Sequence, residues 1–213
     1  MKESLNEKMK AALEDFDMEA TIGLAKEAVG LNIDAFEAIE LGLLPGLKAV
    51  GDKFNSGEYF LPELMLGAEI FKKAAKILEQ KISSEKLFPK GTIVLGTVKN
   101  DIHDIGKNLV GTMLSTAGIR VVDIGVDCSA DQFVDKALEV NAKVIGASAL
   151  LTMVLDKQKE LIQVLNKRGL RKRFKVVVGG AAVSAEWAKR IGADAYAENA
   201  HEAITVISSL LQE

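Results

Sequence analysis

The feature that most limits how this chain can fold is a change of hydrophobic period close to residue 90. Before it, apolar residues recur every three or four positions, as in amphipathic helices. After it, short β-branched runs alternate with helical stretches, which predicts parallel strands joined by helices. The strand runs are Thr92–Val98, Arg120–Gly125, Val144–Ser148, Lys175–Gly179 and Ala193–Tyr196, with helices near 104–117, 130–141, 154–168, 184–191 and 200–211.

The predicted fold class is therefore α/β. An N-terminal bundle of four or five helices precedes a flavodoxin-like or Rossmann-like, doubly wound sheet of five parallel strands. The predicted domains are a helical domain over 1–88 and a sheet domain over 89–213, with a hinge through residues 80–91. Within the bundle, the apolar run 35–44 predicts one helix, Pro45 falls at the start of the next, and Pro62 is placed to open the last helix.

Composition narrows the function classes. With 48% hydrophobic and 27% charged residues the chain is typical of a soluble globular protein, and its net charge of -3 gives no reason to expect nucleic acid or an anionic membrane as partner. The single cysteine, Cys128, permits no internal disulfide and is expected to pack beside a strand end. No stretch is apolar and long enough to cross a bilayer, and no secretory signal precedes the helices, so the expected location is the cytoplasm.

The segment from Asp101 to Lys107, with sequence DIHDIGK, joins the first strand to the helix after it. Its side chains therefore lie at the carboxyl edge of the sheet, where open α/β sheets bind ligands. His103 could bind a metal through one ring nitrogen while Asp101 accepts the proton of the other. Gly106 would let a bulky group approach the backbone. A histidine in a loop is more often merely solvated, so the other strand ends must decide between these interpretations.

Small and polar residues follow the other strands at the same edge. Ser148 ends the third strand, with Leu150 and Thr152 after it, and Gly179 ends the fourth strand, with Gly180 after it. Small residues at several neighbouring strand ends predict a deep, wide slot rather than a compact phosphate cradle. The glycine pair would let a flat or extended ligand lie against the backbone.

These motifs in this order resemble the signature of cobalamin (B12) domains, which reads D-x-H-x-x-G, then S-x-L, then G-G. The longer match over Gly96–Val98 and Asp101–Asn108 is similar to methionine synthase and to the corrinoid proteins of methyltransferase systems for methanol, methylamines, glycine betaine and methoxyarenes. In the N-terminal half, Glu40, Val50–Phe54 and Tyr59–Glu63 resemble the helical cap domain of those proteins. The resemblance covers nearly the whole chain.

The resemblance implies a cobamide or methylcobalamin cofactor, bound base-off/His-on. His103 would then be the lower ligand of cobalt and Asp101 would accept a hydrogen bond from its other nitrogen. Phe54 and Leu61 would cap the upper face of the corrin, with Glu40 close by, although both apolar residues could equally be core. The remaining implied cofactor-binding residues are Asn100, Ile102 and Asp104 in the loop under the corrin, Gly106, Ser148, Leu150, Thr152, Gly179 and Gly180 near the slot, and Ala200 near the nucleotide loop.

Two positions depart from the family pattern. Methionine synthase continues its relay to a serine in a T-P-S stretch, but Thr152 is followed here by Met153 and Val154. We therefore expect a His–Asp dyad without a serine. Asn100 stands where glycine is usual, and we expect the loop to tolerate it. For Lys107, solvation is favoured over contact with the corrin amides, and for Trp187 we favour packing over function.

The resemblance implies a corrinoid carrier, a non-catalytic subunit that shuttles a methyl group on cobalt, between Co(I) and methyl-Co(III). One partner would be a substrate-specific methyltransferase, and a second would pass the methyl group to tetrahydrofolate or a thiol, with a reductive activase as a further candidate partner. The alternatives are a subunit of an adenosylcobalamin mutase and a cobalamin-sensing regulator. The helical half disfavours the mutase, and the absence of a basic recognition helix disfavours the regulator. A phosphoacceptor receiver domain is disfavoured because Ser148 stands where that class needs an aspartate.

Overall fold

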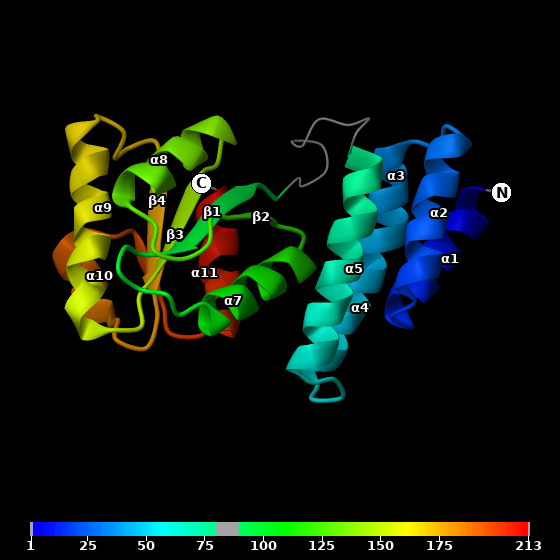
Figure 1. Ribbon diagram of the computed structural model, residues 1–213, viewed down its shortest axis with the longest axis horizontal. Coiled ribbons are helices and arrows are strands. Elements are labelled where there is room, and N and C mark those ends of the chain that lie inside the picture. The colour runs from blue at the N-terminus through cyan, green and yellow to red at the C-terminus, as the bar shows by residue number, and fades with distance from the viewer. Residues whose placement is uncertain (1, 80–89, 213) are drawn as a thin grey trace. The chain divides into compact units, whose positions relative to one another are not determined.

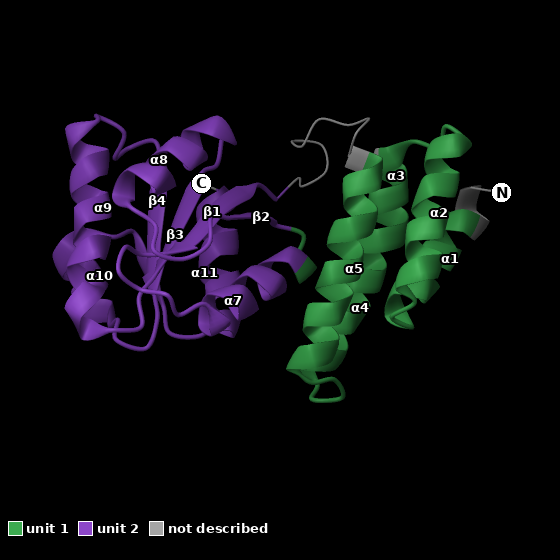
Figure 2. Cartoon of the chain, viewed as in Figure 1, with its two compact units in different colours: residues 1–89, 116–118 green, residues 90–115, 119–213 purple. Residues whose placement is uncertain are grey.

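The computed structural model describes residues 2–79 and 90–212, which form two compact units (Figures 1 and 2). Unit 1 takes in residues 1–89 with 116–118, and unit 2 takes in residues 90–115 with 119–213. The predicted boundary between residues 88 and 89, and most of the predicted hinge over 80–91, lie outside the described residues. Within the described chain, no helix combines the length and the apolar character needed to cross a membrane.

Unit 1 is a bundle of helices, as the apolar period predicts. The helices pack through fully buried side chains that include Met9, Leu13, Leu47, Leu64 and Ile70. Helix α1 contacts α2, η1 and α4, and α2 contacts α5. The elements are α1 (Lys2–Glu14), α2 (Met18–Gly30), α3 (Ala35–Ala38), the π-helix η1 (Ile39–Leu43), α4 (Leu44–Asn55) and α5 (Leu61–Glu79).

The prediction that Pro45 lies at the start of a new helix is confirmed, but no turn separates that helix from the elements before it. Helices α3, η1 and α4 follow one another without a turn, and Pro45 lies in the first turn of α4. The Leu44 N–H donates to the carbonyl of Ile39, five residues back, so the helix is one residue wider here. Proline has no N–H and its ring crowds the preceding turn of a regular helix, and the wider π turn relieves that conflict.

Unit 2 contains a sheet of five parallel strands, as predicted, and the strand order is β2-β1-β3-β4-β5. The strand limits differ slightly from the prediction: β1 stops at Thr97, β2 stops at Asp123, and β5 is shifted to Ala195–Ala197. The elements are β1 (Thr92–Thr97), α7 (Ile105–Thr116), β2 (Arg120–Asp123), α8 (Ala130–Glu139), β3 (Val144–Ser148), the 3-10 turn η2 (Thr152–Val154), α9 (Leu155–Lys167), β4 (Lys175–Gly179), α10 (Ala185–Ile191), β5 (Ala195–Ala197) and α11 (Ala200–Gln212).

Helices cover both faces of the sheet (Figure 1). On one face, α8, α9 and α10 pack Phe133, Leu161 and Trp187 against strand residues such as Ile145. On the other face, α7 and α11 pack against alternate strand residues that include Ile93, Val144 and Val177. Trp187 is core, as predicted, and so is Cys128, whose Sγ lies 3.2 Å from the Ile124 carbonyl oxygen. Parallel pairing brings all strand ends to one edge, so Ser148 lies opposite both Thr97 and Gly179.

The chain leaves β3 and β4 through a close backbone contact at that edge. Gly180 has a φ of +115°, and a Cβ at this position would overlap the carbonyl oxygen of Ala149. Only glycine fits both the dihedral angle and the space. The ends of the two central strands are therefore fixed relative to each other.

Replacing Gly180 by alanine should lower the free energy of unfolding of unit 2 by about 3 kcal/mol, because strain and overlap act together. Gly192→Ala is the matched control. Gly192 also has a positive φ, of +81°, but a Cβ there would meet no heavy atom within 4 Å, so we expect a loss of about 1 kcal/mol. Urea unfolding followed by the fluorescence of Trp187, the only tryptophan, measures both losses. Equal losses would contradict the close contact.

Candidate functional site

The loop between β1 and α7 places a histidine at the carboxyl edge of the sheet. Thr97, the last residue of β1, donates a hydrogen bond from its hydroxyl to the carbonyl of His103 at 2.9 Å. The N–H of Asn108 donates to the carbonyl of Asp104 at 2.7 Å and so closes the first turn of α7. The loop is thus fastened to the strand before it and to the helix after it.

Asp101 and His103 form the hydrogen-bonded pair that the D-x-H spacing predicts. Asp101 is 1% exposed, whereas the His103 side chain is 47% exposed. The Asp101 Oδ1 lies 2.6 Å from His103 Nδ1 and accepts a second hydrogen bond from the His103 N–H at 3.0 Å. Its Oδ2 accepts from the N–H of Leu150 at 2.7 Å. The buried carboxylate therefore meets three donors.

The charge of this carboxylate decides which ring nitrogen carries the proton. Burial raises the pKa of Asp101, but the hydrogen bonds from Leu150 and from the backbone and ring of His103 hold it below its ordinary value of 3.8. An ionised carboxylate can only accept, so Nδ1 of His103 is the donor. In the neutral imidazole, Nε2 then keeps its lone pair available for a metal.

The third partner of Asp101 on the β3 side is a backbone amide, with no serine in the relay position. Val154 is buried in the 3-10 turn η2, and the Leu150 N–H makes the contact to Asp101 instead. This arrangement fits the expectation of a His–Asp dyad. A backbone donor cannot take up the proton, so it only orients the carboxylate.

Asn100 adopts a left-handed backbone with a φ of +67°. Asparagine tolerates this conformation better than most residues, which explains why it can stand where glycine is usual. Its N–H donates to Asp127 at 2.8 Å, and Lys99 pairs with the same carboxylate at 2.8 Å. The N–H of Asp127 in turn donates to the carbonyl of Asp101 at 2.9 Å. The loop after β2 therefore braces the histidine loop.

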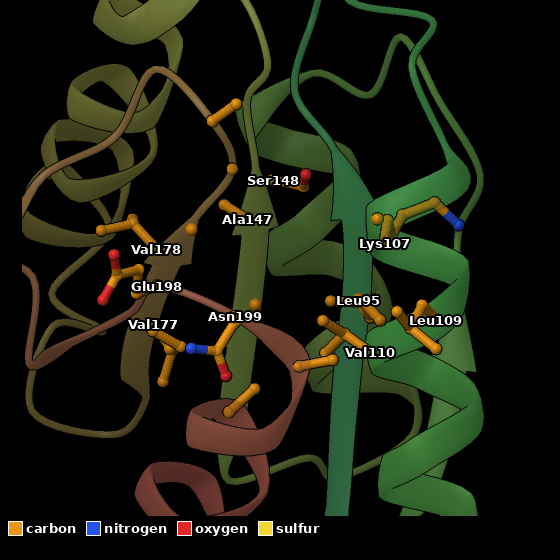
Figure 3. Close-up of a pocket in the computed structure, with 18 of the residues that line it drawn as sticks. Leu95, Lys107, Leu109, Val110, Ala147, Ser148, Val177, Val178, Glu198 and Asn199 are labelled. Carbon is orange, nitrogen blue, oxygen red and sulfur yellow. The ribbon is translucent and has the colours of Figure 1, made fainter. Parts of the chain in front are cut away.

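The expectation that Lys107 is solvated is wrong. Its side chain is buried, and Nζ donates to Asp123 at 2.5 Å and to Asn108 at 2.7 Å. The first turn of α7 packs toward the end of β2, which turns position 107 inward, and Asp123 compensates the buried charge. Figure 3 shows the amine directed away from the cavity that its stem helps to line.

A cavity of about 370 Å³ opens beside His103, between the strand ends and helices α7 and α11 (Figure 3). The cavity is left unfilled because small residues occupy the strand positions that face α7 and α11. Gly146 and Ser148 alternate with core residues on β3, Gly179 ends β4 and Ala197 ends β5. Leu95 of β1 and Val110 of α7 lie on one side of the cavity, and Val177 of β4 lies on the other.

The structure brings together many, but not all, of the predicted residues. Thr152 is exposed in η2 and does not line the cavity, and Asn100, Ile102 and Asp104 lie in the histidine loop outside it. The predicted residues that line the cavity are His103, Gly106, Ser148, Leu150, Gly179, Gly180 and Ala200.

Apolar side chains are exposed in or next to the two loops that meet at Asp101. Ile102 is 75%, Ile105 78% and Met153 83% exposed, and Leu150 and Leu151 are also exposed. Apolar surface of this kind favours the binding of a ligand that removes it from water. Ile105 and Met153 were not predicted as site residues, because apolar residues at helix starts usually belong to a core.

The three predicted residues of unit 1 do not all have the same environment. Glu40 is exposed in η1, whereas Phe54 on α4 and Leu61 at the start of α5 are half-buried. Half-burial is compatible with core packing and with contact to a ligand. Their approach to a cofactor remains a prediction.

Several residues that line the cavity were not assigned to the site from sequence. Those on α11 follow a helical spacing with Ala200, a signal that would have found them once α11 was placed over the sheet. They are Leu95, Leu109, Val110, Gly146, Ala147, Val177, Val178, Ala181, Ala197, Glu198, Asn199, Ala203 and Ile207.

Comparison with known families gives two matches of the same description. Residues 91–205 match a family described as the B12 binding domain, and residues 5–79 match a second family of B12 binding domains. The two matches cover most of both units. The chain is thus similar to this class of proteins in the helical half as well as in the sheet.

Individual proteins agree with these matches. A corrinoid protein of Desulfitobacterium hafniense (strain Y51) is 44% identical over 211 residues, which cover 98% of both chains. A dimethylamine corrinoid protein of Methanosarcina mazei is 43% identical over 99% of this chain and 98% of the relative. A chain of the methanol:cobalamin methyltransferase complex of Methanosarcina barkeri has a TM-score of 0.87 and 23% identity, covering 98% of this chain and 80% of that one. This last likeness supports the fold.

Asp101→Asn should change the pH dependence of stability. Because the folded pKa of Asp101 lies below its unfolded value, the carboxylate contributes its full stabilisation above about pH 4, and this contribution is lost as the pH falls through the folded pKa. Wild type should be more stable than the variant at pH 7, and the difference should shrink below pH 3.8. Urea unfolding at a series of pH values measures it. A difference that stays constant down to pH 3 would contradict the stabilised carboxylate.

Proposed function

The chain belongs to the B12-binding corrinoid proteins, and on this premise we propose that it carries a methyl group on a bound corrinoid from one methyltransferase to another. The observation that carries the proposal is the buried Asp101 carboxylate, which leaves Nε2 of His103 available at the edge of an apolar cavity. The first methyltransferase would be specific for the methyl donor, and the second would pass the methyl group to tetrahydrofolate or a thiol. A reductive activase is a further proposed partner.

The described residues fit a corrinoid. His103 would hold the metal of the corrinoid through Nε2, and the cofactor would supply the metal's other ligands itself. The exposed side chains of Ile102, Ile105 and Met153 offer an apolar platform beside that nitrogen. Gly106 is also informative, because a Cβ there would meet no heavy atom within 4 Å, so packing within the protein does not require glycine at this position. Close approach of a ligand to α7 gives a reason for this glycine.

The cavity suits the nucleotide base of a corrinoid in the base-off state. Its volume of about 370 Å³ lies in the usual range for small-molecule sites, and its walls are mostly apolar. The hydroxyl of Ser148 has no hydrogen-bond partner among the described residues, so it can bond to a nitrogen of the base. The glycines at positions 179 and 180 let the base and its linker lie against the backbone.

When bound, the corrinoid supplies the metal that accepts and releases the methyl group. The protein contributes the environment of the lower ligand. Asp101 would make His103 a stronger electron donor to a metal held at Nε2. Leu150 keeps Asp101 in place through its N–H.

For unit 1 we propose the role of a cap. Phe54 and Leu61 would shield the upper face of the corrin, with Glu40 close by, and the cap would have to move aside for a methyltransferase. The match of residues 5–79 to a B12 binding domain supports this proposal. Full-length similarity to corrinoid proteins, one of them a dimethylamine corrinoid protein, favours a carrier over a mutase subunit or a regulator.

Reconstitution with hydroxocobalamin tests the ligand directly. The wild-type protein should bind it base-off/His-on, and His103→Ala should lose that absorbance spectrum because no imidazole replaces the displaced base. His201→Ala is the control, since His201 lies exposed in the first turn of α11. Failure of the wild-type protein to bind any corrinoid would refute the proposed function. Retention of the spectrum in His103→Ala would refute the assignment of the ligand.

Filling the cavity tests where the base goes. Ala203→Met places a longer side chain in the cavity from α11 without backbone strain, and should weaken binding of cobalamin by at least about tenfold. Cobinamide, which lacks the nucleotide, should bind to the variant as it does to wild type. Thr205→Met, at an exposed position of the same helix, should leave both affinities unchanged. Equal weakening of both ligands by Ala203→Met would argue against the slot.

A further inference from the structure

Gln158 on α9 is a fully buried amide in which every polar atom is bonded. It is 0% exposed, and its Nε2 donates to the carbonyl of Ala147 at 2.8 Å and, at a longer 3.4 Å, to the carbonyl of Gly179. Its Oε1 accepts from the indole N–H of Trp187 on α10 at 2.9 Å. A buried amide is costly unless its hydrogen bonds are made, so this side chain is held in one orientation.

Both carbonyl partners of Gln158 belong to residues that line the cavity. Ala147 and Gly179 lie at the ends of β3 and β4, and their neighbours Ser148 and Val178 are seen beside the cavity in Figure 3. Helix α9 covers the opposite face of the sheet, with the core of Leu161 and Trp187. Gln158 therefore holds the two strand ends from the face of the sheet opposite the cavity.

The four residues from Ala147 to Leu150 are held at both ends. The carbonyl of Ala147 accepts from Gln158, and the N–H of Leu150 donates to the ligand-orienting carboxylate of Asp101. In between, the N–H of Ala149 donates to the carbonyl of Gly179 at 3.0 Å. Ser148, with its unpaired hydroxyl, lies in this segment. Its position in the cavity thus depends on both attachments.

We propose that Gln158, oriented by Trp187, is a positioning residue for the part of the cavity that receives the nucleotide base. It holds the ends of β3 and β4 at the separation that the base requires and sets the place of the Ser148 hydroxyl. This inference rests on the proposed corrinoid function and adds a specific role for two core residues. Because Gln158 acts behind the sheet, its loss should affect the base and leave the corrin ring itself largely unaffected.

The test compares cobalamin with cobinamide, which shares the corrin but lacks the nucleotide. Gln158→Met keeps the length and helix propensity of the side chain and removes its hydrogen bonds. The dissociation constant for cobalamin, measured from the absorbance change on binding, should rise by about tenfold, while that for cobinamide should change by less than about twofold. Trp187→Phe, which keeps the Gln158 donors and removes the indole N–H together with part of the ring system, should give the same selectivity with a smaller loss.

Leu161→Ala controls for loss of stability alone. Leu161 lies on the same helix, is buried in the same core and has no side chain group that could bond to the strand ends. Leu161→Ala should lower the melting temperature and change the dissociation constants for cobalamin and cobinamide by the same factor. If Gln158→Met weakens cobalamin relative to cobinamide no more than Leu161→Ala does, Gln158 is only a core residue and the inference is overturned.

The remaining outcomes are also decisive. If Gln158→Met does not fold, Trp187→Phe decides: a selective loss of cobalamin supports the inference, and an equal loss or no loss overturns it. A wild-type protein that binds cobalamin no better than cobinamide would overturn the inference while leaving the carrier function standing. A wild-type protein that binds neither would refute the proposed function itself.

Discussion

The structure of the site depends on one hydrogen bond between a buried carboxylate and a half-exposed imidazole. Asp101 is held by donors from its own loop and from the residue that follows β3, so its orientation is set by two strands at once. Since the carboxylate stays ionised, it determines which nitrogen of His103 carries the proton. Without that constraint, either nitrogen of the ring could be the one left free for a metal beside the exposed apolar loops.

The rest of unit 2 can be understood as support for this contact. Small residues on one face of the strands leave a cavity next to the histidine, and Gly180 fixes how the chain leaves the two central strands. The loop after β2 braces the histidine loop through Asp127, and Lys107 ties α7 to the end of β2. On the opposite face, Gln158 satisfies carbonyls at the strand ends. Ordinary core interactions thus determine the geometry of a binding edge.

Much of this could be predicted from the sequence, because local patterns encode it. The alternation of strand and helix runs gave the parallel sheet, and the D-x-H spacing gave the contact of Asp101 with His103. Features that depend on distant partners were missed. Lys107 is buried because Asp123, on another element, faces it, and the cavity extends to Ala203 because of where α11 packs. Gln158 is polar and lies on an amphipathic helix, so only its neighbours reveal that it faces inward. The π turn before Pro45 has no simple sequence pattern.

The most direct test of the central claim is the identity of the nitrogen on the metal. Protein grown with nitrogen-15-labelled histidine, loaded with unlabelled cobalamin and reduced to the Co(II) state, should be measured by electron paramagnetic resonance. The account predicts that labelling converts the nitrogen hyperfine splitting from triplets to doublets, because the axial nitrogen belongs to His103. Triplets that persist in the labelled protein would mean that the nucleotide base still binds the cobalt, and would contradict the account.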